Sequence, residues 1–270
     1  MVSPTDSPLV LVDDTGTVRR LTLSRPSAAN AFDLALSDAF AAALADAAAD
    51  DDVRVVVVTG AGKHFSAGAD LGDLARGSDV VDDDADERPA LGSSSSFGRG
   101  MSAFIGALGT FRKPLVAAVN GAAVGIGATM LLHCDLVIVS DRARLRLPFT
   151  SMGVSPEAGS TVLLPRLIGR QQAARLLFTS TWVDAADAVD LGLALAVSHH
   201  DALLDDAHSL AAEIAHHPLT SLIATKELLL AAERELVDAA IARESASFAS
   251  LLASPGVRDR LRGQTGDRAT

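Results

Sequence analysis

Glu157 is the residue whose type and surroundings most directly suggest chemistry. It is the only carboxylate in residues 147–161, LPFTSMGVSPEAGST, a stretch punctuated by glycine and proline. A carboxylate among apolar side chains is poorly hydrated, so its pKa rises and it can accept and return a proton near neutral pH. The stretch therefore predicts a site of proton transfer on a small molecule. The structural alternative is that Glu157 caps a helix starting near Gly159 or is solvated at a turn.

A first glycine-containing segment, HFSAGADL, lies upstream at residues 64–71. It follows a β-branched run that predicts a strand, and the small residues Ala67 and Gly68 would let a ligand approach the main chain closely. The free polar groups at such a turn are N–H donors. Taken alone, the segment is equally typical of a tight turn before a helix that Asp70 caps.

A second glycine-rich segment, NGAAVGIGATM, covers residues 120–130. It follows a strand pattern and leads into a helix, so N–H groups near Ile126 would point out of a helix start that carries partial positive charge. An anion or a polarised carbonyl is the group expected there. Dinucleotide binding is disfavoured, because a G-x-G-x-x-G pattern beginning at Gly125 reaches Met130 in its last position.

The elements that must position these segments alternate between strand and helix patterns. Two alternating segments, 9–13 and 18–24, flank the turn formers Asp14 and Gly16 and predict a hairpin. Downstream, helical patterns alternate with β-branched apolar runs, which predicts an α/β core. The expected helices are 32–51, 101–111 and 128–133, and the expected strands are 53–60, 114–121 and 135–140.

The remaining segments set the expected domain organisation. Residues 72–100 lack periodicity and are expected to form a mobile surface loop, either beside the site or as an insertion without function. From residue 201 onward the pattern is helical, with a break at His217 and Pro218. We expect a core over residues 1–200 that holds the site and a helical region over 201–270, packed on the core or on a neighbouring subunit.

Composition disfavours several classes of partner. The 270-residue chain is 49% hydrophobic and carries a formal charge of -11, but six of its acids lie within residues 79–87. Because basic residues form no cluster, neither nucleic acid nor an anionic membrane surface is an expected partner. No apolar run reaches the roughly 18 residues that span a bilayer, and no export signal is recognisable, so we expect a cytoplasmic protein. Cys134 is expected to be a small buried apolar residue, and the histidine pairs lack metal-ligand spacing, so no metal is expected.

Four segments, in this order, resemble the enoyl-CoA hydratase/isomerase (crotonase) superfamily: residues 21–33 (LTLSRPSAANAFD), residues 64–71, residues 113–135 and the Glu157 segment. The resemblance covers about residues 8–200 in detail and the tail by pattern. It implies a spiral of ββα units with a C-terminal helical region used in trimerisation, in a homotrimer or a dimer of trimers. It also implies an acyl-CoA thioester substrate, with coenzyme A as part of that substrate and no separate cofactor.

The resemblance also assigns roles to individual residues. Glu157 would be the catalytic residue, and the backbone N–H groups of Ala67 and Ile126 would form an oxyanion hole for the thioester enolate. One such donor is typically worth about 3 kcal/mol of transition-state stabilisation. The residues expected to bind the substrate lie in the same segments: Ser66, Gly68, Ala69, Asp70, Leu71, Gly125, Phe149 and Met152.

Two positions distinguish between activities. Hydratases of this superfamily use two glutamates, at positions that here hold Thr129 and Phe149, and neither side chain is a general base near neutral pH. Glu157 in SPEAGST instead resembles the catalytic glutamate of peroxisomal-type Δ3,Δ2-enoyl-CoA isomerases. The resemblance thus implies an isomerase that moves the double bond of a 3-enoyl-CoA to the 2-trans position by a single-glutamate proton shuttle, in fatty acid β-oxidation. The alternatives are an enoyl-CoA hydratase, another crotonase-type acyl-CoA lyase, hydrolase or dienoyl isomerase, and a non-catalytic acyl-CoA-binding protein.

Overall fold

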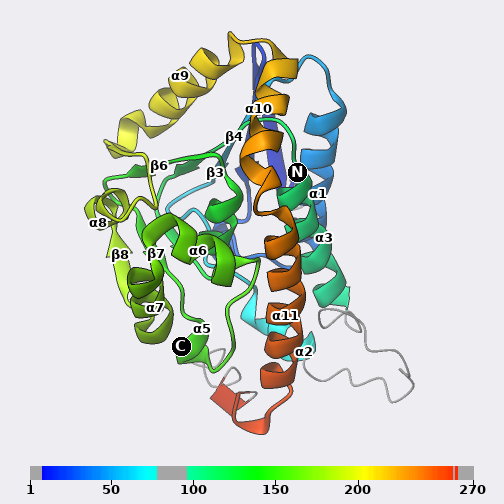
Figure 1. The fold of residues 1–270 in the computed structure, drawn as a ribbon, viewed down its shortest axis with the longest axis vertical. Helices are drawn as coiled ribbons and strands as arrows, with labels where there is room; N and C mark the ends of the chain where they lie inside the picture. The colour runs from blue at the N-terminus through cyan, green and yellow to red at the C-terminus, as the bar shows by residue number, and fades with distance from the viewer. Residues whose placement is uncertain (1–7, 78–95, 258, 261–270) are drawn as a thin grey trace, which may run out of the picture.

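A computed structural model describes residues 8–77, 96–257 and 259–260 of the protein and contains two β-sheets (Figure 1). The six-stranded sheet has the spatial order β1 (Val10–Thr15), β2 (Val18–Leu23), β3 (Val55–Gly60), β4 (Leu115–Val119), β6 (Leu136–Ser140) and β9 (Ala196–Ser198). The three-stranded sheet has the order β5 (Ala122–Val124), β7 (Arg144–Arg146) and β8 (Trp182–Asp184).

The pairing of the larger sheet begins with a hairpin. Strands β1 and β2 are antiparallel, with Val10 opposite Leu23 and Thr15 opposite Val18. The later pairs, β2–β3, β3–β4, β4–β6 and β6–β9, are parallel. Parallel neighbours need crossover connections, and the intervening helices supply them. The predicted hairpin and the predicted α/β core are confirmed.

Both faces of the larger sheet are covered, which explains the unbroken valine run of β3. Alternate residues of a strand point to opposite faces. Val55 packs in the cluster that includes α9 (Leu203–Ala215), whereas Val56 packs in the cluster that includes α1 (Leu34–Ala49) and α3 (Ser96–Thr110). A strand buried on both faces is apolar at every position, as the sequence predicted for this run.

Three phenylalanines join α1 and α3 beneath the sheet. The side chains of Phe32, Phe40 and Phe104 are fully buried. The Phe104 ring centroid lies 4.6 Å from that of Phe32 and 5.4 Å from that of Phe40. Asp33 begins α1 by accepting the N–H of Leu36 at 2.7 Å. The chain just before α1 is therefore fixed by both a cap and an aromatic anchor.

The prediction of a mobile loop over residues 72–100 is wrong at both ends of that range. Residues Leu71–Gly77 form α2, and α3 already begins at Ser96. Asp70 begins α2, since its Oδ1 accepts the N–H of Gly72 at 2.9 Å. A helix of two turns is too short for apolar periodicity to stand out in a sequence. The rest of the expected loop lies outside the described residues.

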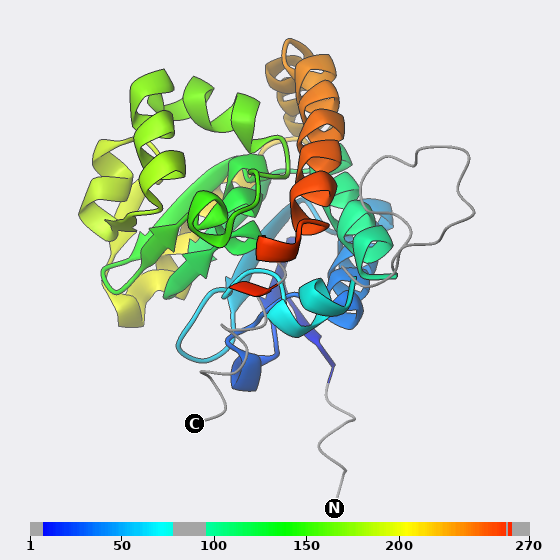
Figure 2. The same ribbon diagram turned by 90° about the horizontal axis from the view of Figure 1, so that it is seen from below.

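The C-terminal part of the chain is helical, as predicted. Helix α9 is followed by α10 (Leu219–Ala231) and α11 (Arg234–Leu252), with the break at Pro218. Helix α9 covers one face of the larger sheet. Helix α11 lies against α6 (Ser160–Ile168) and runs between α6 and α3 in two perpendicular views (Figures 1 and 2). Helices α9 and α11 of the tail thus pack on the core of the same chain.

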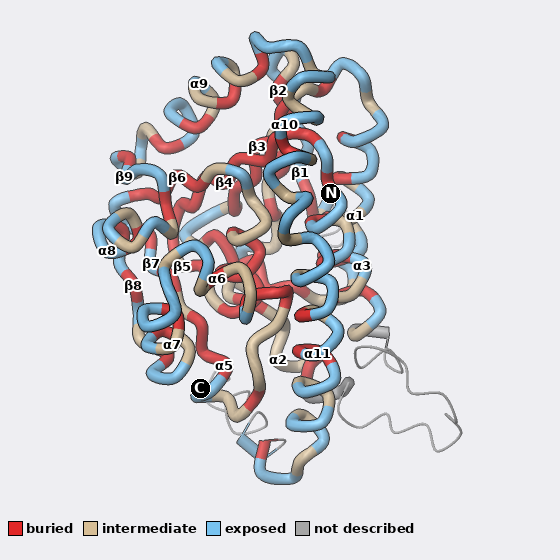
Figure 3. The backbone as a smooth tube through the Cα atoms, viewed as in Figure 1, coloured by how far each residue is buried: buried red, intermediate tan, exposed pale blue. Residues whose placement is uncertain are grey.

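Short elements complete the chain. Figure 3 shows β3, β4 and β6 buried at the centre, whereas much of α10 and α11 is exposed on the outside. The short elements are η1 (Pro26–Ala28), α4 (Ile126–Thr129), η2 (Met130–His133), α5 (Phe149–Met152), α7 (Arg170–Thr179), α8 (Ala185–Asp190) and η3 (His200–Ala202).

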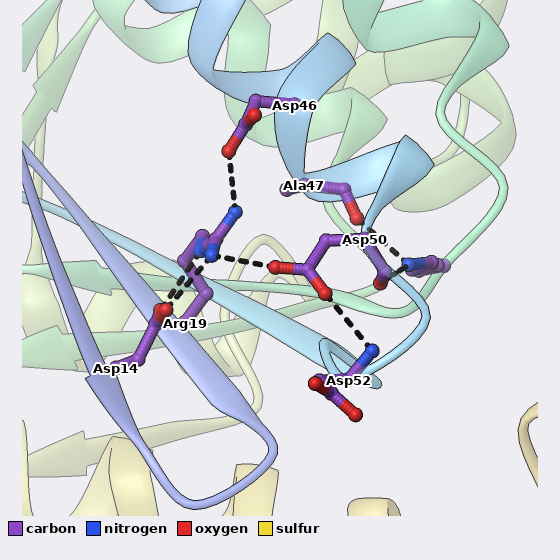
Figure 4. A network of polar contacts seen from close by, with 7 residues as sticks. Asp14, Arg19, Asp46, Ala47, Asp50 and Asp52 are labelled. Carbon is purple, nitrogen blue, oxygen red and sulfur yellow. Dashed lines mark hydrogen bonds and ion pairs between the residues drawn. The ribbon is translucent and has the colours of Figure 1, made fainter.

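Arg19 joins the hairpin to the C-terminal end of α1 (Figure 4). Its guanidinium is almost fully buried and donates to Asp14 (2.8 Å from both Nε and Nη2), Asp46 (2.7 Å) and Asp50 (2.9 Å). A buried cation requires such partners, because an unpaired one is costly. The hydrogen bonds from Arg19 lower the pKa of Asp14 below its ordinary value.

Replacing Arg19 with alanine should lower the free energy of unfolding by about 2 to 3 kcal/mol, since three carboxylates lose their shared cation. Arg20→Ala is the matched control, because the Arg20–Asp13 pair is exposed and should contribute at most about 0.5 kcal/mol. Urea unfolding followed by circular dichroism measures both. The pKa of Asp14 is lowered in the folded state. The part of the wild-type free energy of unfolding that comes from ionised Asp14 should therefore be lost as the pH falls below the ordinary value of 3.8. Equal losses in the two variants would contradict the assignment.

Candidate active site

The three segments singled out in the sequence meet around one pocket of about 670 Å³, a volume typical of small-molecule sites. Its wall is drawn from residues 27–31, 67–74, 124–126 and 146–157, and from Phe248 of α11. The residues of the wall that the sequence predicted are Ala67, Gly68, Ala69, Asp70, Leu71, Gly125, Ile126, Phe149, Met152 and Glu157.

Ser66, expected to bind the substrate, does not line this pocket and requires a correction. Its side chain is fully buried behind the wall. The hydroxyl donates to the Asn30 carbonyl at 2.8 Å and accepts the N–H of Gly68 at 3.2 Å. Ser66 therefore supports the turn from behind, because its side chain points into the protein.

The two glycine-rich segments touch through their backbones. The carbonyl of Ser66 accepts the N–H of Val124 at 2.9 Å. Gly68 has φ +93°, and a Cβ added there would lie 2.6 Å from the Val124 carbonyl oxygen. Gly125 also has a left-handed φ, +54°. Only glycine combines this backbone conformation with such a close approach, so Gly68 is required for the two N–H-bearing segments to share one pocket.

The two N–H groups predicted to form the oxyanion hole differ in their bonding. The N–H of Ile126, at the start of α4, has no acceptor among the described residues. The N–H of Ala67, by contrast, donates to the Ala29 carbonyl oxygen at 2.9 Å. A thioester oxygen would meet a free donor at Ile126 and would have to share or displace the existing hydrogen bond at Ala67.

Glu157 lies on a turn of unusual backbone conformation. The two residues after it, Ala158 and Gly159, have left-handed φ values of 59° and 73°. A Cβ added at Gly159 would lie 2.9 Å from Val237 Cγ1 of α11. The Ala158 carbonyl accepts a hydrogen bond from His133 Nε2 at 2.8 Å. Since a non-glycine residue rarely adopts this conformation, tertiary contacts determine the turn.

The N-terminus of α6 is capped by Glu244 of α11 and not by Glu157. The Glu244 carboxylate accepts the N–H of Gly159 at 2.7 Å and that of Thr161 at 2.8 Å. The capping alternative considered for Glu157 is therefore wrong, and Glu157 lines the pocket instead.

The surroundings of Glu157 favour its neutral form. Burial and, to a smaller extent, the negative charge of Glu244 together raise its pKa from the ordinary value of 4.5 to about 8. Phe149, Met152 and Val154 supply apolar surface to the same pocket. A carboxyl group whose pKa lies near the working pH can both accept and return a proton.

Asp70 is the second acid of the pocket wall, and it is differently placed. Its Oδ2 accepts a hydrogen bond from Arg25 Nη1 at 2.9 Å, and its Oδ1 begins α2. Burial opposes its charge, but the hydrogen bonds from Arg25 and from the N–H groups of Asp73 and Gly72 outweigh that effect and lower its pKa. Asp70 is thus engaged as an ionised structural partner.

The two positions that hold glutamate in hydratases carry no acid, and the structure adds where they lie. Thr129 is fully buried and does not line the pocket; its hydroxyl is directed at the Gly125 carbonyl at 3.4 Å. Phe149 is part of the wall. Among the residues that line the pocket, Glu157 and Asp70 are the acids.

Several residues of the site were not predicted. Glu244 and Phe248 both come from α11, and Arg146 from β7 also lines the pocket. Glu244 and Phe248 are four residues apart and so share a helix face. The sequence shows that spacing but not which surface α11 packs against, so their role could not be inferred.

Two further observations concern the described residues alone. No group of three or more His, Cys, Asp or Glu side chains there could hold a metal ion. Within the same ranges, no helix combines the length and the apolar character needed to cross a membrane. Burial raises the pKa of Cys134 to about 12, so this thiol is unreactive.

A parallel α/β fold that brings a free backbone N–H and a buried carboxylate to one pocket is suited to enzymes that stabilise an enolate while moving a proton. Comparison with known proteins agrees with this class. Residues 13–263 match the family Enoyl-CoA hydratase/isomerase. The chain therefore belongs to the enoyl-CoA hydratase/isomerase family.

Individual relatives carry different activities in their names. The chain is 35% identical to the 2,3-dehydroadipyl-CoA hydratase of Escherichia coli K12 over 87% of this chain and 86% of that protein. It is 33% identical to enoyl-CoA delta isomerase 2 of Rattus norvegicus over 85% of this chain and 56% of that protein. The crystal structure of an enoyl-CoA hydratase/isomerase from Pseudoalteromonas atlantica T6c superimposes with a TM-score of 0.85 at 33% identity, covering 96% of this chain and 97% of the other. The predicted crotonase-like fold is confirmed.

Glu157→Gln should make the protein more stable at pH 8 than the wild type, by about 1 to 3 kcal/mol, with little difference near pH 5. The reason is the raised folded-state pKa. As the pH rises from 4.5 to about 8, the unfolded chain loses this proton while the folded chain keeps it, so wild-type stability declines across that window. Urea unfolding at several pH values measures the effect, with the exposed Glu235→Gln as control. The same pH dependence in the wild type and Glu157→Gln would show that Glu157 ionises normally.

Proposed function

We propose that the protein is a Δ3,Δ2-enoyl-CoA isomerase that moves the double bond of a 3-enoyl-CoA to the 2-trans position, in fatty acid β-oxidation. The observation that carries this proposal is a pocket with a single unpaired acid, Glu157, whose pKa is raised to about 8. The isomerase name of the rat relative is consistent with it. The proposal also fits the absence of an acid at Thr129 and Phe149.

In the proposed mechanism one carboxylate moves one proton. Ionised Glu157 removes a proton from the alpha carbon of the acyl chain, and the thioester oxygen takes up negative charge. The N–H of Ile126 would stabilise that oxygen, with Ala67 as the second donor when its bond to Ala29 is shared or replaced. Glu157 then returns the proton to the gamma carbon, which leaves the double bond conjugated with the thioester. The apolar wall limits proton exchange with water during the transfer.

Hydration is the main competing reaction, and the Escherichia coli relative named as a hydratase favours it. Adding water to a 2-enoyl-CoA requires one group that activates water and one that manages the proton at the alpha carbon. Among the described residues that line the pocket, Asp70 is the only acid besides Glu157, and it is already bound to Arg25. The pocket therefore favours isomerisation over hydration.

The test is to incubate the protein with 3-hexenoyl-CoA and separately with 2-hexenoyl-CoA. With the first, absorbance of the conjugated thioester should rise; with the second, little 3-hydroxy product should form. Glu157→Gln keeps the shape of the side chain, so it should retain ligand affinity while kcat falls by at least about a hundredfold. Rapid formation of the 3-hydroxy product would favour a hydratase. Binding without turnover of either thioester would favour a non-catalytic acyl-CoA-binding protein.

We also propose that the protein forms a homotrimer or a dimer of trimers. Leucines on the outer side of the C-terminal helices support an interface: Leu228 is 77% exposed and Leu229 is 72% exposed on α10, and Leu236 is 50% exposed on α11. Such exposed apolar residues are typical of surfaces that another subunit covers.

Sedimentation equilibrium should give three or six times the chain mass of 27.8 kDa. Leu228→Glu with Leu229→Glu should shift the protein towards the monomer, because the two charges would be buried in the interface. A matched double substitution on the exposed side of α7, Arg170→Glu with Gln171→Glu, should leave the mass unchanged. A wild-type monomer at micromolar concentration would contradict the proposal.

A further inference from the structure

The buried carboxylate of Glu244 lies outside the pocket wall but directly behind the turn that carries Glu157. Glu244 belongs to α11 and is 5% exposed. Its Oε2 accepts the N–H of Gly159 at 2.7 Å, and its Oε1 accepts both the N–H of Thr161, at 2.8 Å, and the Thr161 hydroxyl. The backbone carbonyl of the same residue accepts the Ser155 hydroxyl at 3.3 Å. Glu244 is thus bonded to the chain on both sides of Glu157.

These bonds hold a backbone that would not keep its conformation unaided. Ala158 and Gly159 are left-handed in succession, and the first of them has a Cβ that opposes this conformation. Helix α11 fixes the turn through Glu244, and η2 fixes it through the His133 bond to the Ala158 carbonyl. The direction of the Glu157 side chain therefore depends on a helix that begins almost 80 residues later in the chain.

The two carboxylates have opposite surroundings. The carboxylate of Glu244 receives three hydrogen bonds from protein donors. The carboxylate of Glu157 receives none from the described residues. The negative charge of Glu244 adds to burial in raising the pKa of Glu157.

We propose that Glu244 is a positioning residue for Glu157: it fixes the 155–161 turn through its hydrogen bonds, and its negative charge acts on the nearby carboxyl group of Glu157. This inference rests on the proposed function, in which Glu157 moves a proton. Glu244 itself does not touch the pocket, and its influence on the reaction is exerted through the turn and through its charge.

Other charged groups surround the same turn. His133 of η2 binds the Ala158 carbonyl, and burial lowers its pKa, which leaves it neutral at neutral pH. Asp70 and Arg146 lie on the pocket wall, and Arg166 of α6 is paired with Glu233 at 2.8 Å. Of the described charged groups, Glu244 is the one whose charge adds to burial in raising the pKa of Glu157.

The experiment compares the wild type with Glu244→Gln and with Thr161→Val. The titration of the Glu157 carboxyl carbon is followed by NMR after ¹³C-glutamate labelling, with Glu157→Gln used to assign the signal. The same proteins are assayed for kcat/KM against pH with 3-hexenoyl-CoA. Thr161→Val removes one hydrogen bond to Glu244 but keeps its charge, so it is the matched control.

In Glu244→Gln the Glu157 midpoint should move to lower pH, and the ascending limb of kcat/KM should move with it. The kcat should also fall by about tenfold to a hundredfold, because the turn loses one of the two acceptor oxygens of Glu244 and the base is misplaced. Thr161→Val should lower the midpoint of thermal unfolding but leave the titration of Glu157 unchanged. Glu244→Asp, which restores the charge on a shorter side chain, should return the midpoint towards the wild-type value.

An unchanged Glu157 midpoint in folded Glu244→Gln would overturn the inference. If Glu244→Gln does not fold, Glu244→Asp is the deciding variant. It keeps the negative charge but has a shorter side chain. We therefore expect a Glu157 midpoint near the wild-type value together with a reduced kcat. The NMR titration needs no turnover. Full activity of Glu157→Gln would therefore contradict the proposed function, whereas the titration test of Glu244 would still be valid.

Discussion

A carboxylate that has no hydrogen-bonding partner among the described residues, with Phe149, Met152 and Val154 on the same pocket wall, is the constraint on which the site depends. Water would solvate such a group, and a nearby cation would pair with it, and either would return its pKa to the ordinary range. Arg146, which lies on the pocket wall, donates to the Ser180 carbonyl at 2.8 Å, and Arg25 is committed to Asp70. Burial and the charge of Glu244 raise the pKa of Glu157 to about 8. The same pocket thus contains one paired acid whose pKa is lowered, Asp70, and one whose raised pKa suits it to accept and return a proton, Glu157.

The fold meets this constraint by bringing distant segments to one place. Strand β3 leads into the turn with Ala67 and Gly68, and β4 leads through β5 into the start of α4, where the N–H of Ile126 is free. Parallel strands end at the same edge of a sheet, so the loops that follow them are neighbours although they are far apart in sequence. The close contact of Gly68 with the Val124 carbonyl then fixes the distance between the two loops.

Much of this arrangement could be predicted from local patterns. The valine run of β3 is apolar at every position because both faces of the strand are covered, and such runs indicate buried parallel strands. The hairpin followed from alternation around Asp14 and Gly16, and the pocket segments followed from small residues placed after strands. Local patterns failed where an interaction depends on distant packing. The side chain of Ser66 turns inward to bond the Asn30 carbonyl, and the Ala67 N–H is taken by Ala29. The pattern of apolar and polar residues along the sequence does not identify either of these hydrogen-bond acceptors.

The contribution of α11 could not be predicted for a related reason. Its sequence predicts a helix, but hydrophobic spacing does not identify the surface that a helix covers, and Glu244 on such a helix suggests a solvated charge. Its carboxylate is instead the cap of α6, so the N–H groups at the start of that helix and the left-handed turn before it are satisfied by one side chain from another element. Because α11 also supplies Phe248 to the pocket wall, the wall is complete only when α11 is packed against the core. The way α11 packs is therefore a physical means of tuning the pKa of Glu157 without changing the residues that line the pocket.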